Sequence, residues 1–187
     1  MRLTPRQPGA YPWYLRPLFR LQKRKYGAVL QSALLWARSP RLFLSIAIFY
    51  GALERKGSPL DPALRSLLIV RVSQLNHCPF CVDLNSATLR ERGAGFEKIE
   101  ALADWRPSDL FDARERAALD YAEAVTLSSR EVDDDLMDRL KALFSEDAIV
   151  ELTGLIAFQN MSSKFNSALD VPPQGFCKIP DRTPPTG

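Results

Sequence analysis

Apolar side chains recur every three or four residues along almost the whole chain, which is the spacing of one face of an α-helix. No stretch alternates between apolar and polar residues as a half-buried strand does. Residues typical of helix starts divide the pattern, namely Asp61-Pro62, the capping box from Asp112 to Glu115, and Ser145. We therefore predict an all-α fold with helices over residues 12–25, 27–38, 41–55, 61–76, 79–92, 112–126, 133–144 and 145–169. Only a short turn is expected over residues 96–103.

The length and composition of the chain fit one domain. It has 187 residues, of which 46% are hydrophobic, enough for a single core. Neither an internal repeat nor an inter-domain linker is visible. We predict one helical bundle over residues 1–187, with a basic helical extension over residues 1–40 and a proline-rich tail over residues 171–187.

The first part of the chain is strongly basic. Nine Arg or Lys residues and no Asp or Glu lie between Met1 and Leu53, although the net charge of the whole chain is only +3. This asymmetry is compatible with an anionic partner, but apolar residues such as Leu15 and Phe19 are interleaved with the basic ones. The interleaving favours a helix that packs on the acidic remainder of its own or a neighbouring subunit. We expect no nucleic-acid partner.

The most apolar segment runs from residue 42 to residue 53. It covers twelve residues, whereas a membrane-spanning helix needs about 20, so we predict no membrane span and a cytoplasmic protein. Within this segment, a largely apolar stripe repeats at helical spacing and consists of Leu42, Ser45, Ile46, Phe49 and Leu53. The stripe suits either the core of the subunit or a contact between subunits, and we expect it to contribute to a homo-oligomer interface.

Reactive chemistry is most readily placed at the C-x-x-C motif formed by Cys78 and Cys81. These residues would share one face of a helix whose first turn contains Pro79. The free N–H groups at a helix start favour a thiolate, and a second thiol one turn away can close a disulfide. Two other interpretations remain open: a zinc site that adds Cys177 and His77, or two buried cysteines acting as small apolar residues.

Four segments of the chain are similar to segments of one known family, namely 66–86 (SLLIVRVSQLNHCPFCVDLNS), 121–124 (YAEA), 151–160 (ELTGLIAFQN) and 165–173 (FNSALDVPP). The chain resembles the AhpD-like, carboxymuconolactone decarboxylase family from about residue 42 to residue 177. The resemblance implies an all-α fold, a homo-oligomer (dimer, trimer or hexamer) and thiol peroxidase chemistry. In that chemistry Cys81 would attack a peroxide, and Cys78 would resolve the resulting sulfenic acid.

Two further positions of the family's site hold other residues in this chain. The family places a glutamate twelve residues before the first cysteine and a histidine four residues after the second, and these positions hold Ser66 and Asn85 here. Neither side chain exchanges a proton near pH 7, so the family's proton relay is expected to be missing. His77, the single histidine of the chain, is the other candidate for an auxiliary role.

We therefore predict a thiol-disulfide oxidoreductase of the alkylhydroperoxidase type, an antioxidant protein in which Cys81 and Cys78 are catalytic. The resemblance implies no metal and no organic cofactor. The substrate would be a peroxide or a disulfide, and an external dithiol would regenerate the thiols. The alternative is a non-catalytic or redox-sensing helical oligomer with structural cysteines. Lactone decarboxylation is the least expected activity, because the family's decarboxylases are implied to use histidines and this chain has one.

Overall fold

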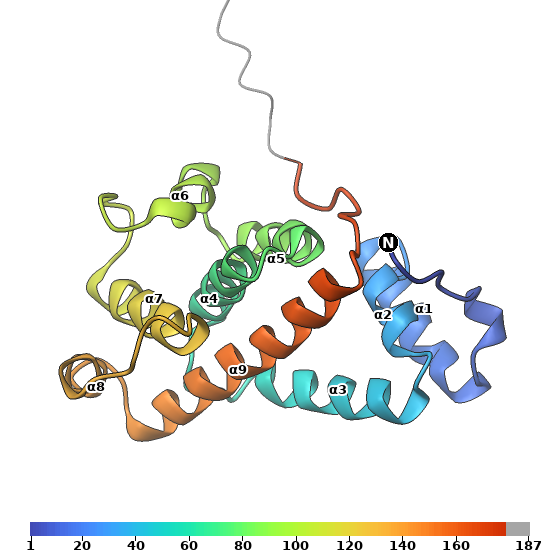
Figure 1. Cartoon of the computed structure of the whole chain (residues 1–187), viewed down its shortest axis with the longest axis horizontal. Helices are drawn as coiled ribbons and strands as arrows, with labels where there is room; N and C mark the ends of the chain where they lie inside the picture. Colours follow the sequence, from blue (N-terminus) through green and yellow to red (C-terminus); the bar gives the residue numbers. More distant parts are fainter. Residues whose placement is uncertain (179–187) are drawn as a thin grey trace, which may run out of the picture.

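The computed structural model describes residues 1–178 (Figure 1). In it, helices begin at the capping residues that the sequence predicts. The Asp61 side chain accepts hydrogen bonds from two backbone N–H groups of the helix that follows it. Asp112 and Glu115 form the predicted reciprocal capping box, and Ser145 caps the last helix. The all-α prediction is confirmed, since the described residues contain helices and no strand.

The α-helices within residues 1–178 are α1 (Arg16–Tyr26), α2 (Gln31–Trp36), α3 (Pro40–Leu53), α4 (Pro62–Leu75), α5 (Pro79–Glu91), α6 (Phe96–Ala101), α7 (Ala113–Thr126), α8 (Asp134–Lys141) and α9 (Glu146–Ala168). Short 3-10 helices are η1 (Pro8–Ala10), η2 (Trp13–Leu15) and η3 (Leu102–Asp104).

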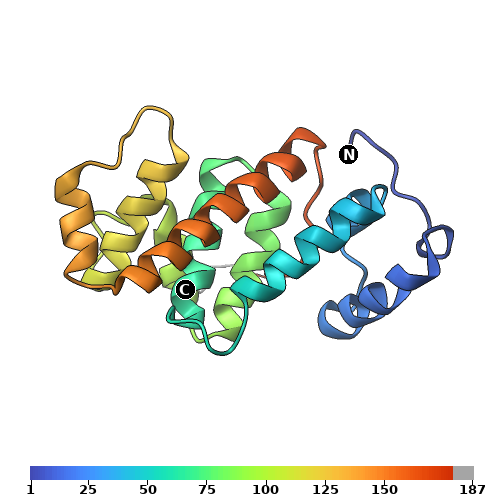
Figure 2. The same cartoon turned by 90° about the horizontal axis from the view of Figure 1, so that it is seen from below.

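Helix α4 is the centre of the fold because it is buried on almost every side. Leu67, Leu68, Val70 and Val72 are all almost completely buried. Helices α5, α7 and α9 pack against it, and the long α9 crosses the molecule between α7 and α3 (Figures 1 and 2). Helices α1 and α2 lie at the end of the molecule opposite to α7 and α8 (Figure 2). The cysteine motif at the start of α5 is therefore placed between the central helix and the N-terminal extension.

Two predicted elements differ from the observed ones. The helix predicted over 27–38 is shorter, because Gly27 adopts a φ of 76° at the end of α1, and α2 begins only at Gln31. The prediction of a short turn over 96–103 is wrong, since this segment forms α6 and η3. Ile99 and Leu102 are buried in the main core, so packing stabilises a helix that is too short to be stable alone.

Apolar contacts hold the extension over residues 1–40 on the bundle. Tyr11, Leu15 and Phe19 are buried in one cluster with Phe43 of α3. The rings of Phe19 and Phe43 stack with their centroids 5.8 Å apart. The predicted amphipathic helix with a buried apolar stripe is thus present in this segment.

The positive charges of the extension contribute little to this packing. Within residues 1–178, none of the Arg or Lys side chains of residues 1–53 forms an ion pair with a carboxylate. The ion pair made by the extension is that between the α-ammonium of Met1 and Asp170, at 2.9 Å. Within the described residues, these basic side chains therefore form no ion pair with acidic residues of their own subunit, and the expected contact with a neighbouring subunit stays a prediction.

The described part of the proline-rich tail, residues 171–178, lies against α5. The carboxylate of Asp83 accepts hydrogen bonds from the backbone N–H groups of Gln174, Gly175 and Cys177, each at 2.8 Å. One carboxylate thus ties the tail to the helix that carries the cysteine motif. Residues 179–187 of the predicted tail lie outside the described residues.

Helix α3 leaves an apolar face uncovered, although no helix within residues 1–178 is both long and apolar enough to cross a membrane. Leu42, Ile48 and Phe49 retain 45%, 73% and 44% exposure, and apolar faces of this kind commonly mark subunit contacts. We expect the protein to sediment as an oligomer at micromolar concentration and Ile48→Glu to shift it to smaller species.

The matched control for this prediction is Val132→Glu, which adds the same charge to an exposed apolar residue that precedes α8. It should sediment like the parent. A monomeric parent in sedimentation velocity at ordinary salt would contradict the predicted interface.

Candidate active site

A tight turn between α4 and α5 positions the cysteine motif. His77 adopts a φ of 50°, the left-handed conformation that often ends a helix and that histidine tolerates better than most residues. The turn is closed by a hydrogen bond from the Cys78 N–H to the Ser73 carbonyl at 3.0 Å. Cys78 then becomes the N-cap of α5, with Pro79 at the first helical position. The chain reverses here because the cap of one helix leads directly into the start of the next.

The two cysteines of the motif are joined by a disulfide. The Cα atoms of Cys78 and Cys81 are 5.3 Å apart, within the roughly 4.4–6.8 Å that a disulfide needs. The prediction that both lie at the start of one helix, at bonding distance, is therefore confirmed. The Cys81 N–H donates a hydrogen bond to the Cys78 sulfur at 3.2 Å, so one of the free N–H groups of the helix start is directed at this sulfur.

Cys81 lines a cavity of about 400 Å³ between the extension and the bundle. The volume is in the range of small-molecule sites, roughly 300–1,000 Å³. Helices α1, α2, α3, α5 and α9 contribute to the wall, whose aromatic members are Tyr26, Trp36, Phe43, Tyr50, Phe80 and Phe158. Cys78 is 1% exposed and is not among the described residues that line the cavity. Of the two sulfurs, that of Cys81 is thus the one beside space for a substrate.

Tyr50 places a neutral hydroxyl at the wall of this cavity. Burial of the hydroxyl, followed by the nearby Tyr26 and the Glu54 carboxylate, raises the pKa of Tyr50 well above its usual range. The residue as a whole lines the cavity and retains 37% exposure. Tyr50 therefore stays protonated at physiological pH and can donate a hydrogen bond.

Two buried polar residues meet the sulfur of Cys81. The Asn166 amide nitrogen lies 3.3 Å from Cys81 Sγ, and the Ser32 hydroxyl donates to the Asn166 amide oxygen at 2.6 Å. Asn166 comes from α9 and Ser32 from α2. Sequence reasoning missed both as site residues. A buried asparagine within the similar segment 165–173 was the available signal for the first, and no local signal marks the second.

Ser66 and Asn85 occupy separate environments. Ser66 is 2% exposed and accepts a hydrogen bond from Arg92 at 2.9 Å, and the same guanidinium pairs with Glu54. Asn85 lines the cavity and donates to the Cys81 carbonyl one helical turn earlier, at 2.7 Å. The structure therefore places Asn85 beside Cys81 and holds Ser66 in an ion-pair cluster with Arg92.

The family assignment follows from comparison with known proteins. A family model described as "Carboxymuconolactone decarboxylase family" matches residues 40–124. The uncharacterized protein YnjA of Escherichia coli (strain K12) is 48% identical over 171 residues, which cover 91% of this chain and 94% of YnjA. The chain belongs to the carboxymuconolactone decarboxylase family.

Solved structures share the AhpD-like fold of this family. The alkylhydroperoxidase AhpD core of an uncharacterized peroxidase-related protein from Ralstonia eutropha JMP134 superposes with a TM-score of 0.85 at 24% identity, covering 94% of this chain and 93% of that one. A cysteine-to-alanine variant of the debrominase Bmp8, in complex with 2,3,4-tribromopyrrole, superposes with a TM-score of 0.82 at 23% identity, covering 94% and 93%. At these identities the likeness establishes the fold.

The remaining candidate residues lie away from the cavity. The His77 side chain is exposed and is not among the described residues that line the cavity. Burial, followed by the Asp83 carboxylate, raises the pKa of the Cys177 thiol above its usual value, so this thiol is the less reactive kind. Within residues 1–178 no three His, Cys, Asp or Glu side chains are grouped as metal ligands would be. In this part of the chain, the residues of the zinc alternative are therefore not gathered into a ligand set.

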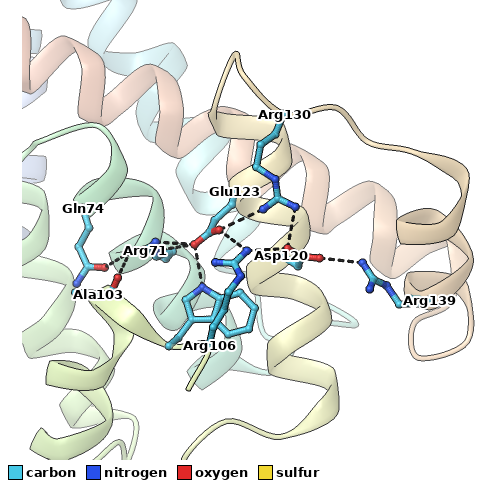
Figure 3. A network of polar contacts seen from close by, with 9 residues as sticks. Arg71, Gln74, Ala103, Arg106, Asp120, Glu123, Arg130 and Arg139 are labelled. Carbon is cyan, nitrogen blue, oxygen red and sulfur yellow. Dashed lines mark hydrogen bonds and ion pairs between the residues drawn. The ribbon is translucent and has the colours of Figure 1, made fainter. Parts of the chain in front are cut away.

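Glu123, a family-like carboxylate of α7, belongs to a separate ion-pair network (Figure 3). It is 3% exposed and accepts hydrogen bonds from Arg71 at 2.6 and 2.8 Å, from Trp105 at 2.9 Å and from Arg130 at 3.2 Å. The Arg106 guanidinium also forms an ion pair with the Glu123 carboxylate, at 2.7 Å. Glu123 thus joins α4, α7 and two loops, and it is not among the described residues that line the cavity.

Proposed function

We propose that this protein is a dithiol peroxidase that reduces a hydroperoxide at Cys81 and stores the oxidising equivalents as the Cys78–Cys81 disulfide. The observation that carries the proposal is that Cys81 lines a cavity and lies at bonding distance from a second thiol that does not. Membership of a family with peroxidase-related structural neighbours supports it.

The reaction needs two steps at sulfur. The Cys81 thiolate attacks the terminal peroxide oxygen and breaks the O–O bond, which leaves a sulfenic acid and an alkoxide that takes up a proton. The Cys78 thiolate then attacks the Cys81 sulfur and expels hydroxide, which leaves as water after protonation. The sum is one hydroperoxide and two thiols giving one alcohol, one water and one disulfide. An external dithiol, by disulfide exchange, regenerates the pair.

The surroundings of Cys78 suit the resolving role. As the N-cap of α5, its sulfur accepts the Cys81 N–H, and the positive end of the helix dipole favours the thiolate that must attack. Proton transfer is the weaker part of the site, because the described cavity wall contains Asn85 where the family implies histidine. General acid-base groups contribute roughly 10²–10⁴-fold, so we expect slow turnover.

The test measures thiols and turnover together. One equivalent of cumene hydroperoxide should remove two thiols from the reduced parent much faster than from a free model thiol. Cys81→Ser should abolish this loss. Cys78→Ser should retain the first step and accumulate a sulfenic acid that dimedone traps. The matched control is Cys177→Ser, which should behave like the parent because this thiol lies outside the cavity-lining set.

Thiol loss no faster than that of a model thiol would contradict the proposal. It would favour the alternative of a non-catalytic or redox-sensing helical oligomer. Equal activity of the parent and Cys81→Ser would assign the reaction to another residue.

A second candidate function is reductive dehalogenation, favoured by the aromatic wall of the cavity. Bmp8, which shares the fold, is a debrominase whose variant is seen in complex with 2,3,4-tribromopyrrole. One aryl bromide and two thiols would give the debrominated ring, bromide, a proton and the disulfide, so the same cysteine pair would suffice. Bromide release from 2,3,4-tribromopyrrole by the parent, but not by Cys81→Ser, would support this function over peroxide reduction.

A further inference from the structure

The side chain of Asn166 reaches from α9 to the start of α5 and ends on the sulfur of Cys81. Its amide nitrogen is 3.3 Å from Sγ although the two residues are 85 positions apart in the sequence. Asn166 is 2% exposed and Cys81 is 3% exposed, so little water reaches the contact. A buried amide of this kind needs a partner for its N–H groups, and the sulfur is the partner that it has here.

Ser32 and the disulfide sulfur together set which end of the amide faces Cys81. The Ser32 hydroxyl donates to the Asn166 amide oxygen at 2.6 Å, and the NH₂ group lies towards Cys81. Rotating the amide by half a turn would bring its oxygen against a disulfide sulfur, which carries no hydrogen. Two acceptors would then face each other in a buried site, at a cost in free energy. The orientation of the donor is thus set before the disulfide is reduced.

The two sulfurs of the motif have different donors. Cys78 accepts the Cys81 N–H at the start of α5, whereas Cys81 accepts the Asn166 amide N–H. Apolar residues including Phe80 and Val171 surround Cys81, and an apolar environment disfavours a thiolate. A single oriented N–H group therefore has a large share in whether Cys81 is ionised, since hydrogen bonds to a charged acceptor are the strong ones.

We propose that Asn166 is a catalytic residue that stabilises the Cys81 thiolate through its amide N–H, and that Ser32 is a positioning residue that fixes this amide. The proposal deepens the peroxidase function and rests on Cys81 being the attacking thiol. Ser32 and Asn166 both lie outside residues 40–124, the part that matches the family model. The N-terminal extension would thus supply part of the site, in addition to one wall of the cavity.

Packing keeps Ser32 at the required place. On the same short helix, Trp36 stacks on Phe165, the residue before Asn166, with ring centroids 3.4 Å apart and planes at 15°. Tyr11 donates a hydrogen bond to the Leu34 carbonyl at 2.5 Å and ties α2 to the start of the chain. The extension is therefore anchored on both sides of the Ser32–Asn166 contact.

The test measures the ionisation of the Cys81 thiol directly and needs no peroxide. In a Cys78→Ser, Cys177→Ser background Cys81 is the remaining thiol, and its alkylation by iodoacetamide is followed from pH 5 to pH 10. Asn166→Leu should move the midpoint of the rate profile up by about one pH unit, the size expected for one hydrogen bond to a charged group. The rate at pH 7 should fall about threefold, because a more basic thiolate is also more nucleophilic.

Ser32→Ala should shift the midpoint in the same direction by a smaller amount. The matched control is Asn160→Ala, also an asparagine of α9, which bonds Asn76 and Thr126 instead of the sulfur. It should leave the midpoint unchanged even if it lowers thermal stability.

An unchanged midpoint in folded Asn166→Leu overturns the proposal, as does an equal shift in Asn160→Ala. If Asn166→Leu does not fold, Ser32→Ala decides, and an unchanged midpoint there overturns it. The shift does not depend on peroxide turnover, so a shifted midpoint in a protein without peroxidase activity would support the thiolate contact and refute the peroxidase function. Peroxidase activity in the parent together with an unshifted midpoint in the variants would support the peroxidase function and refute the thiolate contact.

Discussion

Glu123→Gln is expected to lower the free energy of unfolding by about 3–5 kcal/mol at pH 7, the usual cost of removing one partner from a buried ion pair. Glutamine keeps the size of the side chain but not its charge. Arg71, whose side chain is 12% exposed, would be left without a carboxylate partner. Trp105 would keep at best a weaker acceptor for its indole N–H. Chemical denaturation followed by tryptophan fluorescence measures the change.

The stability that Glu123 contributes should disappear in acid. Burial of the carboxyl raises its pKa, but hydrogen bonds from Arg106, Trp105 and Arg71 outweigh burial and hold the pKa at about 2, below the ordinary 4.5. Since the folded-state pKa is depressed, the contribution is complete above about pH 4.5 and is lost as the pH falls towards 2. The difference corresponds to about 3 kcal/mol. The difference in free energy of unfolding between the parent and Glu123→Gln should therefore decrease as the pH falls from about 4.5 towards 2.

Glu151→Gln is the matched control for this prediction. Glu151 also lies in a helix and binds an arginine, but that partner, Arg55, is 48% exposed, and exposed ion pairs contribute only about 0–1 kcal/mol. A decrease in the free energy of unfolding that is no larger in Glu123→Gln than in Glu151→Gln would contradict the structural role assigned to the network. A difference in this free energy between the parent and Glu123→Gln that stays constant from pH 7 to pH 3 would also contradict it.

Local signals in the sequence were sufficient for the capped helices and for the cysteine pair, but not for α6, which depends on packing. Asp61 and Ser145 cap helices through contacts within four residues, and Cys78 and Cys81 share one helical turn, so spacing alone determines these features. The contacts of Cys81 with other helices are different in kind. Ser32 and Asn166 are 134 residues apart, and only the packing of α2 and α9 on α5 brings them together.

The same limit applies to the carboxylates of α7 and α9. The sequence could not decide whether Glu123 and Glu151 reach the site, because the answer depends on which residues surround each helix. Glu123 faces Arg71 and Trp105, and Glu151 faces Arg55 and Ser58. Both are therefore bound by partners that lie outside the cavity-lining set.

Ser66→Glu combined with Asn85→His is expected to raise the rate of peroxide reduction by at least about tenfold, the low end of what a positioned acid-base group supplies. These positions hold the family's implied relay. Asn85 already lines the cavity with Cys81, so a histidine there would stand beside the reacting sulfur. The double variant should raise the rate of peroxide reduction more than either single variant does, because a relay needs both ends.

The surroundings of Ser66 bear on whether a new glutamate would ionise. A carboxyl placed at a position that is 2% exposed would normally stay protonated and destabilise the fold. Here Arg92 already donates to the Ser66 hydroxyl at 2.9 Å, so a cation is present to stabilise the carboxylate. Arg92 also pairs with Glu54, and the new carboxylate would share that cation.

Glu54→Gln is the matched control, since it changes the charges around Arg92 without supplying a group that transfers protons to the site. Steady-state peroxidase assays on the two single variants, the double variant and this control would use circular dichroism to verify folding. Glu54→Gln should leave the rate near that of the parent. A well-folded double variant no faster than the parent would show that proton transfer does not limit this site. The rate would then have to be limited by ionisation of Cys81 or by reduction of the disulfide, and the Asn166 variants would separate these two steps, because they act on the thiolate alone.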